Sequence, residues 1–352
     1  MISADAVPRA TLAPGYDIPR LIKGGWQLAG GHGAVDNDAA IADMFRFADA
    51  GVTAFDCADI YTGVEELIGR FLREWHNLRG SDAPRIRVHT KCVPDLAGLP
   101  TLTRVDIERI IDRSLVRLGT EQLDLVQFHW WDYTIPGAVE AAMHLRDLQQ
   151  AGKIAQLGAT NFDTAHLSAM LDAGVPIVSH QVQVSLLDRR ALGEMSTVCA
   201  ARGVGLLAYG ALAGGFMHER WLGAAEPVEP CENRSLLKYK LIIDDIGGWA
   251  YFQRLLHALR RIATSHDTTI GAVALRSVLD QPTVAAAIVG ARHAGHLPAT
   301  LAATSLTLTD IDRGHLDAIH RHATSLRGDI YALEREKGGR HASIMRYNLN
   351  TS

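Results

Sequence analysis

The chain has 352 residues, of which 47% are hydrophobic and 21% charged, and its formal net charge is -4. It is long enough to bury a large core, and nothing in its charge suggests a nucleic-acid partner. No apolar run approaches the roughly 20 residues that span a bilayer, and the N-terminal segment lacks the pattern of a secretory signal, so we expect a cytoplasmic location. The cysteines follow no metal-binding spacing, which predicts reduced thiols and no metal site.

Short apolar runs alternate along the chain with longer amphipathic stretches, which is typical of β/α units. In chain order we expect strands at 20–26, 52–56, 86–91, 124–129, 154–159, 177–182, 204–209 and 285–290. We expect helices near 36–50, 64–76, 103–118, 137–151, 163–173, 189–202 and 268–281. Eight parallel strands joined by helices predict an α/β fold, and specifically the closed (β/α)8 TIM barrel.

We expect a single domain over 1–352, because no linker or abrupt change in composition divides the chain. The alternation fails at 216–249, which we interpret as a loop insertion between the seventh and eighth strands, on the active face. It would form a substrate lid or pocket wall, or equally an ordinary surface excursion. The charged segment 328–352 has no clear period and is expected to be a C-terminal extension that packs over the barrel or is mobile.

Polar side chains stand at or just after the ends of several expected strands. The run "GVTAFD" ends at Asp56, "IRVHTK" at Lys91 and "LDLVQFH" at His129, while Tyr61 follows Asp56 by five residues. Because the carboxyl ends of parallel strands lie on one face of a barrel, these residues are expected to share a site despite their separation in sequence.

These residue types suit the reduction of a carbonyl group. A carbonyl that accepts a hydride develops negative charge on oxygen and needs a proton donor there. Tyr61 is a weak acid with an unperturbed pKa of about 10, and the ammonium of Lys91 would lower that pKa. Asp56 would keep Lys91 charged, and His129 would orient the carbonyl oxygen. In the reverse direction Tyr61 would act as a general base.

The motifs "FDCADIYTG", "HTKC", "LDLVQFHW" and "GATNF" resemble those of the aldo-keto reductase superfamily over nearly the whole chain. The resemblance implies a (β/α)8 barrel that binds a nicotinamide dinucleotide in an extended conformation, without a Rossmann fingerprint. It also implies the catalytic set Asp56, Tyr61, Lys91 and His129, with Tyr61 as the proton donor, Lys91 tuning it, Asp56 paired with Lys91 and His129 positioning the substrate.

The resemblance further implies where the nicotinamide end of the cofactor would bind. Thr160 and Asn161 would hydrogen-bond the carboxamide together with Gln181, and Tyr209 would stack on the ring. The other implied positions near this end are the cofactor-binding residues Gly25, Leu212, Gly214 and Gly215 and the substrate-pocket residues Trp26 and Trp130. Gly214 and Gly215 permit close approach of backbone N–H groups to the pyrophosphate, because glycine has no Cβ.

The adenine end departs from the family pattern. Gly290 and Arg292 are present after the eighth strand, where barrels often bind phosphate, and Arg292 could bind one bidentately. His296 stands near a position that is usually basic or Gln, and Ala299 and Thr300 replace the usual Glu-Asn pair. We therefore expect NADP(H) as cofactor, because of Arg292, with NAD(H) not excluded.

The sequence predicts an NAD(P)H-dependent oxidoreductase that transfers a hydride to or from an aldehyde, ketone or sugar carbonyl. Two alternatives stay open: a nucleotide-binding regulatory or sensing subunit with little turnover, and an NAD-dependent sugar or alcohol dehydrogenase that works in the oxidative direction. The expected partner is a small carbonyl or alcohol substrate, with no nucleic acid and no membrane. The sequence does not predict the individual substrate or the oligomeric state.

Overall fold

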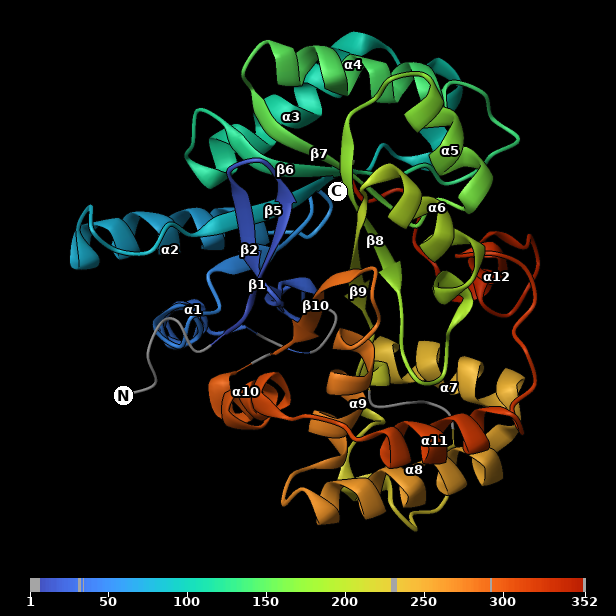
Figure 1. Ribbon diagram of the computed structural model, residues 1–352. Helices are drawn as coiled ribbons and strands as arrows, with labels where there is room; N and C mark the ends of the chain where they lie inside the picture. The colour runs from blue at the N-terminus through green and yellow to red at the C-terminus, as the bar shows by residue number, and fades with distance from the viewer. Residues whose placement is uncertain (1–6, 31–32, 34, 229–232, 292, 351–352) are drawn as a thin grey trace.

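The computed structural model describes residues 7–30, 33, 35–228, 233–291 and 293–350. Its centre is a closed barrel of parallel strands in the order β10-β3-β4-β5-β6-β7-β8-β9, surrounded by helices (Figure 1). The barrel strands are β3 (Leu21–Gly24), β4 (Ala54–Asp56), β5 (Arg87–Cys92), β6 (Leu123–Phe128), β7 (Ile154–Thr160), β8 (Ile177–Gln183), β9 (Gly205–Tyr209) and β10 (Val284–Gly290). The expected (β/α)8 barrel is confirmed, since all eight runs named from the sequence are strands in one parallel sheet.

The helices between barrel strands follow from local sequence signals. They are α1 (Asn37–Asp49), α2 (Val64–Arg79), α3 (Arg104–Leu118), α4 (Ala138–Gln150), α5 (Thr164–Asp172), α6 (Glu194–Arg202) and α9 (Ile270–Leu279). In α3, for example, Thr103 and Asp106 each accept a hydrogen bond from the other's backbone N–H, a capping box that satisfies donors at the helix start. The helix ends before Gly119, whose φ of 67° favours glycine.

A hairpin of β1 (Arg9–Ala13) and β2 (Tyr16–Pro19) covers the amino-terminal end of the barrel. Leu12 of this hairpin lies against Gly205, the first residue of β9, where a Cβ would come within 2.7 Å of the Leu12 side chain. Tyr16 and Ile18 are also buried and belong to the apolar cluster inside the barrel. The opposite, carboxyl-terminal end is therefore the open end available for a site.

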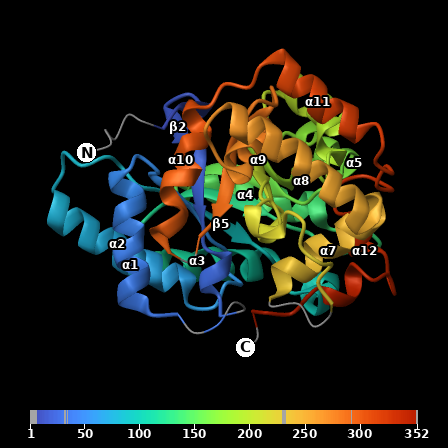
Figure 2. The same cartoon turned by 90° about the horizontal axis from the view of Figure 1, so that it is seen from below.

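The segment between β9 and α9 contains two helices, α7 (Arg234–Ile246) and α8 (Gly248–Ser265). Together with α9 and α11 (Asp310–His320) they form one side of the molecule (Figure 2), around a second apolar cluster that includes Phe252 and Leu255. The interruption of the β/α alternation extends beyond the expected boundary at 249, because α8 continues to Ser265. None of the helices in the described ranges is long and apolar enough to cross a membrane.

The C-terminal part of the chain contains α10 (Leu297–Ser305), α11 and the short α12 (Ala332–Arg335). After α12 the chain crosses the loop that follows β5, where the Leu96 backbone N–H donates to the Tyr347 carbonyl at 3.0 Å and the Asn350 side chain donates to the Val93 carbonyl at 2.7 Å. The extension thus packs on the barrel at the carboxyl ends of its strands, which is one of the two arrangements expected for it.

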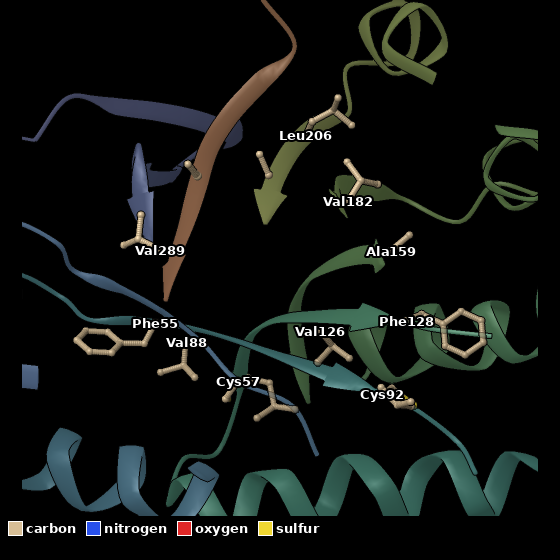
Figure 3. Packing of buried hydrophobic residues seen from close by; sticks show 14 of the residues in the cluster. Phe55, Cys57, Val88, Cys92, Val126, Phe128, Ala159, Val182, Leu206 and Val289 are labelled. Atoms are coloured by element: carbon tan, nitrogen blue, oxygen red, sulfur yellow. The ribbon is translucent and has the colours of Figure 1, made fainter. Parts of the chain in front are cut away.

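Alternation along the strands separates the core from the site. Phe55, Cys57, Val88, Cys92 and Phe128 point outward into the layer between strands and helices, and Figure 3 shows them there. The intervening residues at the strand ends, Asp56 and Lys91 among them, consequently face the barrel interior. Packing of the outer layer therefore fixes the direction of the polar side chains described next.

Candidate active site

The sequence-predicted polar residues gather at the carboxyl-terminal end of the barrel. Asp56 is the last residue of β4, Lys91 lies in β5, His129 directly follows β6, and Tyr61 lies in the loop between β4 and α2. Asp56, Lys91 and His129 are buried, and Tyr61 is half-buried. This is the face on which barrel enzymes carry their active sites.

Asp56 and Lys91 form a buried ion pair, with Lys91 Nζ 2.7 Å from Asp56 Oδ2. The same ammonium donates to the backbone carbonyl of Cys57 at 2.7 Å. Burial alone would lower the pKa of Lys91, but the neighbouring Asp56 carboxylate, together with Tyr61 and Cys57, raises the pKa above its usual value. Lys91 is therefore a fixed positive charge at the site.

Tyr61 stands beside this charge. Lys91 Nζ is 5.1 Å from the centroid of the Tyr61 ring. The centroid of the Trp26 ring is also 5.1 Å from that of Tyr61, and the planes of the two rings are inclined by 59°. Burial raises the pKa of Tyr61 and Lys91 lowers it, and the net pKa is above the usual value. Lys91 lowers the Tyr61 pKa as expected, but this offsets only part of the increase caused by burial, because desolvation of the phenolate is the larger effect.

His129 is held by a backbone contact, with Nδ1 3.1 Å from the Thr160 carbonyl oxygen. Burial, and then the Arg335 charge, lower the pKa of His129 to about 3, so the ring is neutral at pH 7. Because a carbonyl only accepts, Nδ1 carries the single proton and donates it, which leaves Nε2 as an acceptor. Nε2 is buried and has no hydrogen-bond partner among the described residues. This tautomer has no proton at Nε2 to donate to a carbonyl oxygen, so the orienting role expected for His129 takes the form of accepting a hydrogen bond.

The two tryptophans after His129 have different surroundings. Trp131 lies edge-on to the His129 ring at 4.3 Å, and its indole N–H donates to the Pro94 carbonyl. Trp130 packs against Phe128, and its N–H donates to carbonyls of its own loop. Both rings are buried, and Trp131 is the one that contacts the His129 ring, while Trp26 lies beside Tyr61. Trp130 as a substrate-pocket residue stays a prediction.

The residues expected at the nicotinamide end lie close together. The Tyr209 hydroxyl donates to Asn161 Oδ1 at 2.9 Å, and the Asn161 backbone N–H donates to the Gln181 carbonyl at 3.0 Å. The Thr160 hydroxyl also donates to that carbonyl, at 3.2 Å. Asn161 has a φ of 59°, in the left-handed region that a residue other than glycine adopts rarely.

The predicted glycines have packing explanations as well as the functional ones. A Cβ on Gly25 would lie 2.8 Å from the Asp56 carbonyl oxygen, so a glycine there lets β3 approach the end of β4. A Cβ on Gly214 would lie 2.7 Å from the Tyr239 ring of α7, and a Cβ on Gly290 would overlap Gln27. At Gly215, which follows Leu212 in the same loop, the Cβ position is open. Gly215 is thus the position in this loop where a ligand could approach the backbone.

At the adenine end, Arg292 lies outside the described residues. Histidines gather among the described residues at this end: the His293 and His296 rings are 5.3 Å apart, and His218 from the loop after β9 is 6.4 Å from His296. Thr300 is buried in α10, and its hydroxyl donates to the His296 carbonyl. Thr300 therefore has a structural role in the helix that follows this loop.

Several residues that contact the site were not identified from the sequence. Gln127 donates to Asp56, and Arg335 of α12 donates to the carbonyls of Trp130, Trp131 and Asn161 at 2.7, 3.1 and 2.9 Å. Gln127 carried a recognisable signal, because alternation within 124–129 directs it to the same side as His129. Arg335 carried none, since it lies in a segment without periodicity and its partners are distant in sequence.

A family model described as the aldo/keto reductase family matches residues 20–321. The chain belongs to this family. It is accordingly an oxidoreductase that acts on carbonyl compounds, as the match and the aldo-keto reductases among its relatives indicate. The resemblance stated from the sequence motifs is confirmed.

The aldo-keto reductase relatives and the solved structure cover most of the chain. Aldo-keto reductase YhdN of Bacillus subtilis (strain 168) is 26% identical over 321 residues, 88% of this chain and 92% of that protein. The NADH-specific methylglyoxal reductase of Escherichia coli (strain K12) is 26% identical over 348 residues, 90% of this chain and 96% of that protein. Flagellar radial spoke protein 5 of Chlamydomonas reinhardtii is 27% identical over 260 residues, which is 63% of this chain and only 49% of that protein. The structure of glycerol dehydrogenase AKR11B4 from Gluconobacter oxydans aligns with a TM-score of 0.74 at 24% identity, over 89% of this chain and 95% of that chain, which shows the shared fold.

Proposed function

We propose that this aldo/keto reductase transfers a hydride between NAD(P)(H) and an aldehyde, ketone or sugar carbonyl, with Tyr61 as the proton donor. The observation that carries the proposal is the buried Asp56–Lys91 pair, with Lys91 Nζ 5.1 Å from the Tyr61 ring. A fixed ammonium beside a half-buried phenol stabilises the phenolate that remains after proton donation.

The residues at the carboxyl ends of β7, β8 and β9 fit a nicotinamide dinucleotide. Both Nε2 protons of Gln181 are engaged, by Asp56 at 2.6 Å and Gln127 at 2.8 Å, so its Oε1 is the atom available to accept a bond from a carboxamide NH2 group. Thr160 and Asn161 lie beside it, and Tyr209 offers an aromatic ring. A bound NAD(P)H would supply the hydride. The open backbone position at Gly215 suits the approach of a pyrophosphate.

The chain's own residues manage the proton. Tyr61 donates its hydroxyl proton to the oxygen of the carbonyl, and Lys91 stabilises the resulting phenolate. Asp56 keeps the Lys91 ammonium in place through Oδ2. When the substrate is an alcohol, the Tyr61 phenolate takes the proton back, as microscopic reversibility requires.

The state of His129 favours the oxidative alternative as a second candidate. Its Nε2 atom is a buried acceptor without a partner among the described residues, and an alcohol hydroxyl would donate to it. A carbonyl oxygen has no proton to offer. This observation supports an NAD(P)-dependent alcohol or sugar dehydrogenase that binds the alcohol more tightly than the carbonyl.

The choice between NADP(H) and NAD(H) rests on the adenine end. We retain the proposal that Arg292 binds the 2'-phosphate, which favours NADP(H). One relative is named an NADH-specific reductase, so the family relationship alone does not decide the cofactor. Replacing Arg292 by Ala is expected to weaken NADPH binding much more than NADH binding, and equal losses would refute the role. A cytoplasmic location remains a prediction.

A fluorescence titration of the purified protein with NADPH and NADH tests the proposal. It is followed by turnover assays with aldehydes, ketones, sugars and the corresponding alcohols, using the cofactor that binds more tightly. We expect saturable binding and turnover with at least one substrate class. Tight binding with no turnover of any substrate in either direction would instead support the regulatory or sensing subunit.

A further inference from the structure

Gln127 is a buried glutamine at the centre of the candidate site. It lies in β6, is fully inaccessible to solvent, and contacts two residues with different expected tasks. Its Nε2 donates to Asp56 Oδ1 at 2.9 Å, and its Oε1 accepts from Gln181 Nε2 at 2.8 Å. Gln127 therefore connects the residue that holds Lys91 with a residue proposed to hold the carboxamide.

The three connected residues come from alternate strands, Asp56 from β4, Gln127 from β6 and Gln181 from β8. Alternate strands supply the layers that fill a barrel of this kind, and those layers consist mostly of Val, Ile and Leu. A glutamine in such a layer costs free energy unless its polar atoms are paired. Gln127 avoids the cost only through these contacts, with the Thr90 carbonyl as a longer third partner at 3.5 Å.

The orientation of the Gln127 amide is determined by its partners. A flipped amide would place Oε1 against the Asp56 carboxylate and Nε2 against the Gln181 Nε2, so acceptor would face acceptor and donor would face donor. Gly158 of the neighbouring β7 leaves the space that the Gln127 side chain occupies. A Cβ on Gly158 would come within 3.2 Å of Gln127 Cγ.

This orientation has one consequence for each half of the site. Asp56 Oδ1 accepts from the amides of Gln127 and Gln181, so Oδ2 is left for the Lys91 ammonium. Gln181 donates its two Nε2 protons to Asp56 and Gln127, so its Oε1 atom is left to accept from a ligand. The proton-donating half and the nicotinamide-binding half are thus set by the same amide.

We propose that Gln127 is a positioning residue that couples the two halves of the site, holding Asp56 for Lys91 and Gln181 for the nicotinamide carboxamide. The inference rests on the proposed function and goes beyond it by assigning a task to a residue that touches neither substrate nor Tyr61. Gln127 acts through its neighbours, so its loss alters both proton delivery and cofactor binding.

The test compares Gln127→Leu, Gln127→Glu and the control Gln183→Leu. Gln183 is also buried and bonded, to Asp188 at 2.8 Å, but does not touch Asp56. For each variant we would measure thermal unfolding, the dissociation constant for NAD(P)H, and kcat over pH 5 to 9. Gln127→Leu is expected to lose kcat and weaken NAD(P)H binding, each on the order of 10- to 100-fold, whereas Gln183→Leu keeps both near the wild-type values.

The pH dependence of kcat in Gln127→Glu distinguishes a positioning role from a purely structural one. An ionised Glu beside Asp56 is a like-charge pair, but a protonated carboxyl can donate to Asp56 as the amide does. Its kcat, relative to wild type, should therefore recover as the pH falls, while Gln127→Leu shows no such recovery. A Gln127→Glu profile parallel to wild type, or losses in Gln127→Leu no larger than in Gln183→Leu, would overturn the inference.

The two proposals fail in distinguishable ways. A wild-type protein that binds neither NADPH nor NADH overturns both the proposed function and the role of Gln127. A wild-type enzyme that loses turnover in Tyr61→Phe but is unaffected by Gln127→Leu overturns the role of Gln127 alone.

Discussion

Lys238 of α7 and Glu334 of α12 form an ion pair beside Tyr209, with Lys238 Nζ 3.3 Å from Glu334 Oε1. The Glu334 side chain is buried and the Lys238 side chain is 18% exposed. The ammonium also lies 5.1 Å from the Tyr209 ring and 5.5 Å from the Tyr331 ring. Burial would raise the pKa of Glu334, but Lys238 and Arg190 hold it below its usual value. The pair joins the segment between β9 and β10 to the C-terminal extension over the barrel mouth.

Glu334→Gln is expected to lower the free energy of unfolding by about 3–5 kcal/mol, because it leaves the largely buried Lys238 ammonium without its carboxylate. Chemical denaturation measures the change. Asp172→Asn is the matched control, since it breaks a pair with Arg202 whose side chains are 63% and 44% exposed, and it should cost less than about 1 kcal/mol. Equal losses in the two variants would show that the Lys238–Glu334 pair behaves as a surface contact.

Lys91→Met is expected to reduce kcat by about 10²–10⁴-fold, the usual size of a lost acid–base contribution. Burial raises the pKa of Tyr61, and without Lys91 nothing offsets that effect while the Asp56 charge raises the pKa further. The pH profile of the residual activity should therefore shift to higher pH. The double variant Lys91→Met/Asp56→Asn lacks both charges, so its pH profile should shift less than that of Lys91→Met. An equal shift in the two variants would contradict this account of the Tyr61 pKa.

His89 should make the fold less stable in mild acid. Burial lowers its pKa to about 4, so between pH 6.5 and 4 the unfolded chain binds a proton that the folded chain does not. Stability contributed by neutral His89 is then present above pH 6.5 and is lost as the pH falls towards 4, by up to about 3 kcal/mol. The difference in unfolding free energy between wild type and His89→Leu, measured at pH 7 and pH 4.5, isolates this contribution. A difference that does not change with pH would be inconsistent with it.

The sequence was sufficient to locate the barrel and the polar residues at its strand ends, because each strand is an apolar run and alternation directs Asp56 and Lys91 inward. The hairpin β1–β2 was missed although Pro14-Gly15 is a turn signal, since its strands have only five and four residues. Helices α7 and α8 were missed because they pack on each other around a second apolar cluster and interrupt the β/α period.

The burial of Glu334 and the half-buried position of Arg335 could not be predicted from local pattern. Charged residues are normally exposed. Glu334 is instead paired with Lys238, more than 90 residues away in the chain, and Arg335 donates to the carbonyls of Trp130 and Trp131, more than 200 residues away. The lowering effect of Lys91 on the Tyr61 pKa could be predicted from the sequence, but the net direction of that pKa could not, because it depends on the extent of desolvation in the packed structure.

Tyr61→Phe tests the central claim most directly, by measurement of kcat and of the NAD(P)H dissociation constant in the same preparation. The change removes the hydroxyl proton with little change in volume, and Tyr16→Phe, at the opposite end of the barrel, makes the same change away from the site. We expect Tyr61→Phe to lose about 10²–10⁴-fold in kcat with nucleotide affinity nearly unchanged, and Tyr16→Phe to keep its activity. Turnover by Tyr61→Phe within a few-fold of wild type would contradict the assignment of Tyr61 as the proton donor.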